Sequence, residues 1–197
     1  TGNMMQALLK EAISNDILIL NQQNVTSFTD NNSFVEVVTS EISFKTNKLL
    51  FATNGFASQL TNNQVKPARA QVLITKPIEN LDIKGTFHLD QGYYYFRNVG
   101  NRILFGGGRN LDFETETTTE FSQTEIIQNK LEQLLKNVIL PNQTFEIEHR
   151  WSGIMGVGNH KKPIVEQLSN NVYCGVRLGG MGVAIGSLIG KELADLI

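Results

Sequence analysis

The chain ends in the sequence Val172-Tyr-Cys-Gly-Val-Arg-Leu-Gly-Gly-Met-Gly-Val-Ala-Ile-Gly-Ser-Leu-Ile-Gly-Lys-Glu-Leu-Ala-Asp-Leu-Ile197, a short apolar run, a glycine-rich turn and a helical pattern. Residues Val172–Val176 predict a buried strand, and the apolar spacing predicts a helix from Met181 to the terminus. The glycines of residues 179–182 form the turn between them. This arrangement lets backbone N–H groups and the positive end of a helix approach an electron-rich ligand closely.

Spacing alone leaves two interpretations of this turn. Gly180, Gly182 and Gly186 fit G-x-G-x-x-x-G, a loose relative of the dinucleotide-binding fingerprint. That fingerprint requires a second strand and an acidic residue about 20 positions further on, and the sequence ends at Ile197. The alternative is a glycine-rich turn that packs a helix closely against a sheet.

Composition limits the classes of partner. The net charge is −2, and no block of charge indicates a nucleic-acid or membrane-surface partner. No apolar run approaches the roughly 20 residues that span a bilayer. The single cysteine, Cys174, lies in the predicted buried strand, which favours a core residue over a reactive thiol. A chain without a disulfide framework fits a reducing compartment, so we expect a cytoplasmic location.

The first quarter of the chain predicts a helix followed by short strands. The helix begins after Asn3, and the apolar run Lys48–Thr53 is typical of a strand covered on both faces. Asn54-Gly55 breaks this run before a short helix over Phe56–Leu60. The other predicted strands are Ile17–Leu20, Val25–Thr29, Phe34–Thr39 and Glu41–Lys45.

The middle of the chain predicts an antiparallel sheet with tight turns. Its strands are Thr86–Leu89, Tyr93–Arg97, Arg102–Phe105 and Phe145–His149. Ser122 and Glu125 resemble a capping box that opens a helix, which Leu140-Pro141 ends. Gly106-Gly107-Gly108 lacks the Gly-Lys-Ser/Thr of a phosphate loop and is interpreted as a strand end.

Two kinds of catalytic site have no support. The histidines, His88, His149 and His160, are scattered and form no metal-ligand spacing. No serine stands in a G-x-S-x-G elbow, so a hydrolase triad is not indicated.

Several motifs together resemble the FAD-dependent oxidoreductases of the D-amino-acid oxidase superfamily, most closely the D-amino-acid dehydrogenase branch. The terminal stretch is similar to the flavin-contacting segment of that family, and Ala52-Thr53-Asn54-Gly55 resembles its "ATG" motif. Trp151 and Gly153 resemble its W-x-G motif, and Pro163-Ile164 resembles the step before its last strand. The residues that match its terminal glycine pattern are Gly175, Gly180, Gly186 and Ser187.

The resemblance implies an α/β (α+β) fold of the FAD-linked reductase type. Residues 1–66 would form part of the FAD-binding lobe, residues 67–150 a substrate lobe of antiparallel sheet with helices on one face, and residues 151–197 a return to the FAD lobe. The N-terminal Rossmann glycine motif of the family is not in the sequence. We therefore expect a C-terminal fragment that by itself is inactive and binds FAD weakly or not at all.

The same resemblance implies the cofactor contacts. The terminal elbow would lie beside the flavin pyrimidine ring, the "ATG" backbone near the phosphates and ribose, and Val25 near the adenine. The implied FAD-contacting residues are Val25, Ala52, Thr53, Asn54, Gly55, Gly153, Leu178, Gly179, Gly180 and Met181.

Substrate contacts are predicted on the strand Tyr93–Arg97. Period two places Tyr93, Tyr95 and Arg97 on one face, and Tyr95 falls where the amino-acid oxidases carry a substrate-facing tyrosine. Arg97 would offer the fork that carboxylates favour, although a surface arginine beside an aromatic ladder fits the pattern equally well. Met155 stands where those oxidases place a carboxylate-binding arginine. Either Arg97 or Arg69 replaces that arginine, or the substrate is not a simple α-amino acid.

The implied reaction is oxidation of an amine or amino acid by hydride transfer to the flavin, with an unidentified electron acceptor. No catalytic acid or base is required of the chain, because the cofactor carries out the difficult step. Two alternatives remain open: a non-catalytic α+β binding module whose apolar elbow docks a partner, and flavin-dependent oxidation of an α-hydroxy acid.

Overall fold

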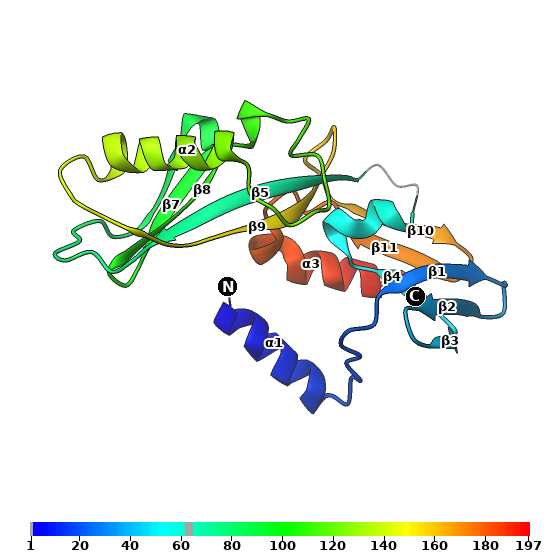
Figure 1. The fold of residues 1–197 in the computed structure, drawn as a ribbon. Coiled ribbons are helices and arrows are strands. Elements are labelled where there is room, and N and C mark those ends of the chain that lie inside the picture. Colours follow the sequence, from blue (N-terminus) through cyan, green and yellow to red (C-terminus); the bar gives the residue numbers. More distant parts are fainter. Residues whose placement is uncertain (1, 62–64) are drawn as a thin grey trace. The chain divides into compact units, whose positions relative to one another are not determined.

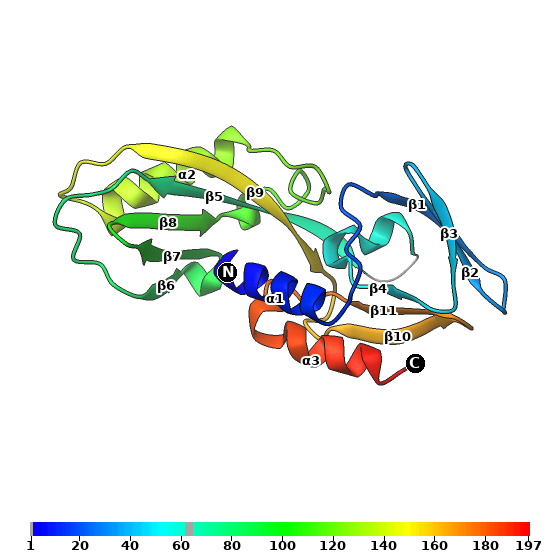
Figure 2. The same ribbon diagram turned by 90° about the horizontal axis from the view of Figure 1, so that it is seen from below.

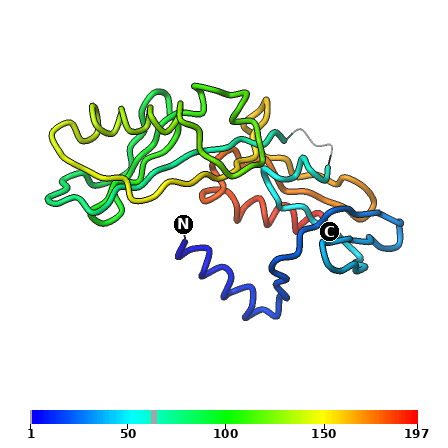
Figure 3. Tube along the Cα trace, in the orientation of Figure 1, coloured from blue at the N-terminus to red at the C-terminus, as the bar shows by residue number. Residues whose placement is uncertain are grey.

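The computed structural model describes residues 2–61 and 65–197, and it divides into two units. The first unit comprises residues 1–63 and 161–197, and the second comprises residues 64–160. The chain therefore builds part of the first unit, forms the second unit and then returns to complete the first (Figure 3). The mixed α/β content with an antiparallel sheet confirms the predicted class.

The first unit contains two three-stranded sheets. One sheet is antiparallel with the order β1-β2-β3, and the other has the order β10-β11-β4, in which β11 and β4 are parallel. The elements are α1 (Gly2–Ser14), β1 (Val25–Asp30), β2 (Val35–Thr39), β3 (Ser43–Thr46), β4 (Leu49–Phe51), the 3₁₀ helix η1 (Asn54–Gln59), β10 (Ile164–Ser169), β11 (Val172–Val176) and α3 (Gly182–Ala194).

The terminal strand and helix form as predicted. All five residues of β11 are buried, including Cys174, as expected for a strand with neighbours on both sides. Helix α3 packs on this strand through Ile189 and Leu193, and it lies alongside β10 and β11 in Figure 2. A Cβ atom at Gly175 would lie 3.0 Å from Leu193, so the small residue permits the close approach of helix and strand.

The predicted strand Ile17–Leu20 is wrong. These residues form no strand, and their side chains are exposed. An apolar run of this length needs a hydrogen-bonding neighbour to become a strand, and no strand of the described residues pairs with it. Helix α1 before it also has no buried residue.

The second unit is a five-stranded antiparallel sheet with the order β6-β7-β8-β5-β9. Helix α2 covers one face of the sheet (Figure 1), and the core between them contains Leu73, Phe96, Phe105, Ile127 and Leu131. The elements are β5 (Lys66–Thr75), β6 (Thr86–Leu89), η2 (Asp90–Gly92), β7 (Tyr94–Val99), β8 (Arg102–Gly107), η3 (Arg109–Leu111), α2 (Glu125–Leu134), the π-helical turn η4 (Leu135–Ile139) and β9 (Ile147–Val157).

Two details of the second unit differ from the sequence analysis. Helix α2 has Thr124 as its N-cap, without a side-chain capping bond, and the Ser122 hydroxyl instead accepts a hydrogen bond from Arg69. Strand β9 continues to Val157 and pairs with β5 over most of its length. The predicted domain boundary before Trp151 therefore falls inside one strand, and the two units divide after residue 160.

No helix in the parts of the chain that the structure describes is long and apolar enough to cross a membrane.

Candidate functional site

The ends of β4 and β11 form the first candidate site, within the first unit. The two strands are parallel neighbours, paired from Val172↔Leu49 to Cys174↔Phe51. Their carboxyl ends therefore lie at the same edge of the sheet, where ligands of α/β proteins bind. The chain leaves β4 through Ala52–Asn54 and leaves β11 through Arg177–Gly180.

One hydrogen bond joins these two exits. The side-chain Oδ1 of Asn54 accepts the backbone N–H of Leu178 at 3.0 Å, across 124 residues of sequence. Asn54 has a φ of 47°, in the left-handed region that asparagine tolerates better than most residues. The structure thus brings together two segments that were predicted separately.

The elbow after β11 is built from left-handed residues. Arg177, Gly179 and Gly180 have φ values of 64°, 57° and 83°. The tip, Gly179–Met181, is exposed, and a Cβ atom at Gly179 would meet nothing within 4 Å. The N-cap of α3, Met181, supplies no side-chain hydrogen bond, so the first N–H groups of this helix have no side-chain cap.

Arg177 is a residue that the sequence analysis missed. It is buried, and its Nε donates to the carbonyl of Lys162 at 2.8 Å. Its positive φ begins the elbow, and this conformation is uncommon for a long side chain. No sequence signal marks such a residue, because only the tertiary contact with Lys162 holds it there.

The remaining predicted cofactor residues lie in different settings. Ala52 and Thr53 are exposed at the end of β4, and Gly55 is buried in η1. Val25 begins β1, opposite Thr39. Gly153 lies in β9 of the second unit. Their contacts with FAD stay a prediction.

The second candidate site is the sheet face of the second unit that lies opposite α2. Directly paired residues project from the same side of a sheet, so the register defines this face. We call it the open face. The part of it considered as a site contains Ala68, Ala70, Val72, Tyr95, Gly106, Trp151, Gly153 and Met155.

The open face has a flat floor of small residues. A Cβ atom at Gly106 would lie 3.0 Å from the ring of Tyr95, so glycine lets this ring lie against the strand. At Gly153 a Cβ atom would meet nothing within 4 Å, which leaves open space above the strand. Tyr95 is partly buried, and burial raises the pKa of its phenol.

Strand alternation in β7 is confirmed for four of the five predicted positions. Tyr94 and Phe96 are buried in the core, whereas Tyr95 and Arg97 point to the other side. Tyr93 is not part of the strand, because it closes the 3₁₀ turn η2 with helical φ and ψ of −67° and −23°. Its ring instead meets Phe113 edge-on, with 6.2 Å between centroids.

Arg97 and Met155 lie far apart along the sheet. Arg97 pairs with Leu104, and the same row of paired residues continues across the sheet to His149 on β9. His149 precedes Met155 by six residues on that strand. At about 3.3 Å per residue this separation is roughly 20 Å. Arg97 therefore does not occupy the place of residue 155, and its contact with substrate stays a prediction.

The Arg69 alternative is contradicted. Its side chain lies on the α2 side of β5, is 3% exposed and forms a fork-to-fork ion pair with Glu116. The two N···O distances are 2.9 Å from Nε and 2.7 Å from Nη2. This guanidinium is already bound to a carboxylate, so it cannot also bind one from a substrate.

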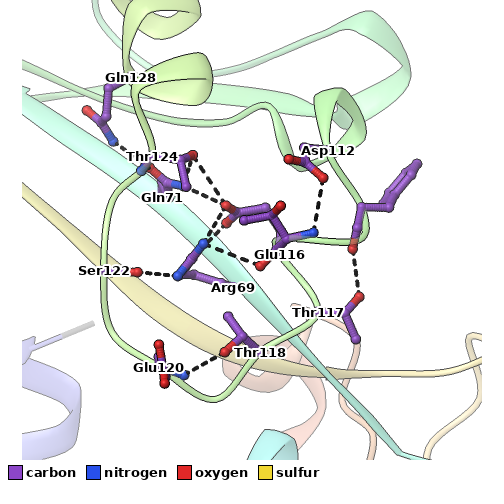
Figure 4. A network of polar contacts seen from close by, with 12 residues as sticks. Arg69, Gln71, Asp112, Glu116, Thr117, Thr118, Glu120, Ser122, Thr124 and Gln128 are labelled. Carbon is purple, nitrogen blue, oxygen red and sulfur yellow. Dashed lines mark hydrogen bonds and ion pairs between the residues drawn. The ribbon is translucent and has the colours of Figure 1, made fainter.

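Glu116 is the centre of a buried network (Figure 4). Its carboxylate accepts hydrogen bonds from Arg69, from Gln71 at 2.9 Å and from the Thr124 hydroxyl at 3.3 Å. Its backbone carbonyl also accepts the N–H of Arg69 at 2.8 Å. The network fastens the loop between β8 and α2 to the back of β5, the strand whose front contributes Ala68 to the open face.

Residues 2–61 and 65–197 contain no group of three or more histidine, cysteine or carboxylate side chains that could hold a metal ion.

Comparison with known proteins agrees with this geometry. A curated relative, the probable oxidoreductase OrdL of Haemophilus influenzae, is 21% identical over 210 residues, which cover 99% of this chain and 46% of that protein. The iminodiacetate oxidase of Chelativorans sp. BNC1 superposes with a TM-score of 0.79 at 19% identity, over 97% of this chain and 53% of that one. The L-proline dehydrogenase of P. horikoshii gives 0.73 at 21% identity, over 90% and 50%.

A third solved structure, the glycine oxidase of Geobacillus kaustophilus, gives a TM-score of 0.76 at 18% identity, over 91% of this chain and 49% of that one. The chain therefore spans about half the length of the relatives that it matches. A family model described as FAD dependent oxidoreductase matches residues 1–196. From this match over nearly its whole length, the chain belongs to the DAO family of FAD-dependent oxidoreductases.

Proposed function

We propose that the joined ends of β4 and β11 form part of an FAD site, and that the full-length protein oxidises an amine or amino acid. The hydrogen bond from Leu178 N–H to Asn54 Oδ1 carries this proposal. It holds the "ATG" segment and the elbow together at the carboxyl ends of parallel strands, the usual position of a nucleotide cofactor. The FAD-linked reductase type of fold is part of the proposal.

The residues present fit the cofactor. When bound, FAD accepts the hydride that leaves the substrate carbon. The exposed backbone of Gly179 and Gly180 and the positive end of α3 would stabilise negative charge at the elbow. Ala52 and Thr53, exposed beside Asn54, would contact the phosphates and ribose, with Val25 toward the adenine.

The open face is proposed as the substrate side. The ring of Tyr95 lies against Gly106 on this face, and it would contact the substrate there. The three solved structures named above are, by their names, enzymes for proline, iminodiacetate and glycine, each of which carries nitrogen and a carboxylate. Their names support an amino acid over a simple amine. An oxidase and a dehydrogenase would use the same site, and the cytoplasmic location remains a prediction.

Flavin binding tests the proposal. We expect the full-length protein to be yellow, and the 197-residue chain to bind FAD weakly or not at all in a fluorescence titration. Anaerobic addition of amino acids to the full-length protein should bleach the flavin band. Bleaching by α-hydroxy acids alone would replace the amine by a hydroxyl substrate. A colourless full-length protein would refute the proposal and leave a binding module.

A further inference from the structure

The second unit contains five arginines, and three of them have carboxylate partners. Arg69 is bound to Glu116, Arg102 to Glu148, and Arg150 to Glu132. Within the described ranges, the side chains of Arg97 and Arg109 form no ion pair or hydrogen bond, although their backbones do. An unpaired guanidinium is available for an anion from outside the chain.

Arg109 is the partly buried member of this pair. It is partly buried in η3, whereas Arg97 is exposed. Burial lowers the pKa of Arg109, with smaller opposing effects from Tyr93 and Glu116. Glu116 does not serve as its partner, because that carboxylate is held by Arg69. A partly desolvated cation without a counterion is a common feature of ligand sites.

The guanidinium of Arg109 lies over an aromatic ring. The Cζ of Arg109 lies 4.7 Å from the centroid of Phe113, and the Phe113 ring meets Tyr93 edge-on. Stacking uses the face of the guanidinium and leaves its N–H edge for hydrogen bonds. A planar fork with a fixed face suits a carboxylate, which accepts two parallel hydrogen bonds. Tyr93, 41% exposed, adds a phenol beside it.

The register brings Arg109 to the end of the sheet that Met155 occupies. Strand β8 stops pairing with β5 at Gly106↔Val72. The chain returns to the same edge of β5 at Glu116, whose backbone carbonyl accepts the N–H of Arg69. Arg109 lies in the segment between these points. On the other edge of β5, the adjacent residue Ala68 pairs with Met155.

We infer that Arg109, stacked on Phe113 beside Tyr93, binds the substrate carboxylate and determines the preference for amino acids over amines. That the bound carboxylate belongs to a substrate rests on the proposed function. The anion site itself is argued from the geometry alone. Arg97, at the opposite end of the sheet, is the competing candidate.

Binding of a minimal carboxylate tests the inference without turnover. Propanoate and its neutral isostere propanamide are titrated calorimetrically into the full-length protein. Arg109→Gln should weaken propanoate binding about thirtyfold or more, because a charge-assisted pair is lost, and change propanamide binding less than about threefold. Arg109→Lys keeps the charge without the planar fork and should lose about tenfold. Arg102→Gln, which removes an arginine already paired with Glu148, serves as the matched control.

Four outcomes would overturn the inference. These are absence of propanoate binding in the unmodified protein, an equal loss of both ligands in Arg109→Gln, an unchanged propanoate affinity in that variant, and a selective loss in Arg97→Gln instead. The proposed function fails separately. A protein without flavin that still binds propanoate through Arg109 would refute the oxidase proposal alone, and a flavin protein indifferent to Arg109→Gln would refute this inference alone.

Discussion

Removal of the Glu116 carboxylate should destabilise the second unit strongly. Glu116 is 0% exposed and Arg69 is 3% exposed, so Glu116→Ala leaves a guanidinium buried without its counterion. Breaking a buried pair in this way typically costs about 3–5 kcal/mol. The variant also leaves the amide of Gln71 with one acceptor fewer. We therefore expect a loss near the upper end of that range.

The assay is urea unfolding followed by the fluorescence of Trp151, the single tryptophan of the sequence, which lies in the same unit. A loss of about 4 kcal/mol moves the midpoint by about 2 M when the slope is about 2 kcal/mol per molar. Glu146→Ala is the matched control. Its pair with Lys76 is exposed, so its loss should change the midpoint little.

A second variant separates the buried charge from the lost packing. Arg69→Met combined with Glu116→Leu removes both charges, and it should recover at least half of the loss, because apolar side chains replace buried pairs well. A Glu116→Ala midpoint as close to the wild type as that of Glu146→Ala would refute the reasoning. So would a double variant less stable than Glu116→Ala.

Three further predictions concern the first unit. Asn54→Gly keeps the left-handed backbone but removes the hydrogen-bond acceptor of the Leu178 amide. In this variant that amide should exchange faster with solvent, and the full-length protein should bind FAD more weakly. Asn54→Ala should be about 1–2 kcal/mol less stable than Asn54→Gly because of strain at a φ of 47°. Gly180→Val places a β-branched residue at a φ of 83° and should reduce flavin content in the full-length protein; normal content and turnover would argue against a flavin at the elbow. Asp30 has a pKa of about 2 rather than 3.8, mainly because the Ser169 hydroxyl donates a hydrogen bond to its carboxylate. The ionised carboxylate therefore stabilises the fold above pH 3.8, and this stabilisation is lost as the pH falls toward 2. Asp30→Asn should remove that part of the acid destabilisation, and an unchanged pH profile of unfolding would contradict it.

Features set by short stretches of sequence were predictable. The strand before the elbow, the turn and α3 follow from one apolar run, three glycines and a helical period, and each forms as predicted. The turn at residues 90–92 and the strand end at Gly107 likewise follow from local glycine chemistry. The family resemblance came from the same local motifs, and the match over residues 1–196 confirms it.

Features that depend on distant residues were not predictable. Ile17–Leu20 has a strand composition, but a strand also requires a partner that the described chain does not provide. Arg69 and Glu116 are 47 residues apart, and no periodicity indicates that a substrate-binding candidate is buried in an ion pair. Tyr93 fits the alternating sequence pattern, but it lies in the 3₁₀ turn before β7 and not in the strand.

The parallel pairing of β4 with β11 also determines the order in which the protein can fold during synthesis. Strand β4 leaves the ribosome before the second unit, whereas its neighbour β11 leaves after it. The bond from Leu178 to Asn54 therefore joins positions 124 apart in the sequence. Long-range closure of this kind is slow, whereas the second unit draws its sheet and helix from one continuous segment. The nascent second unit should thus become protease-resistant first, while β4 remains exposed until β11 has been synthesised. A mutation in the elbow would accordingly act after the second unit has folded.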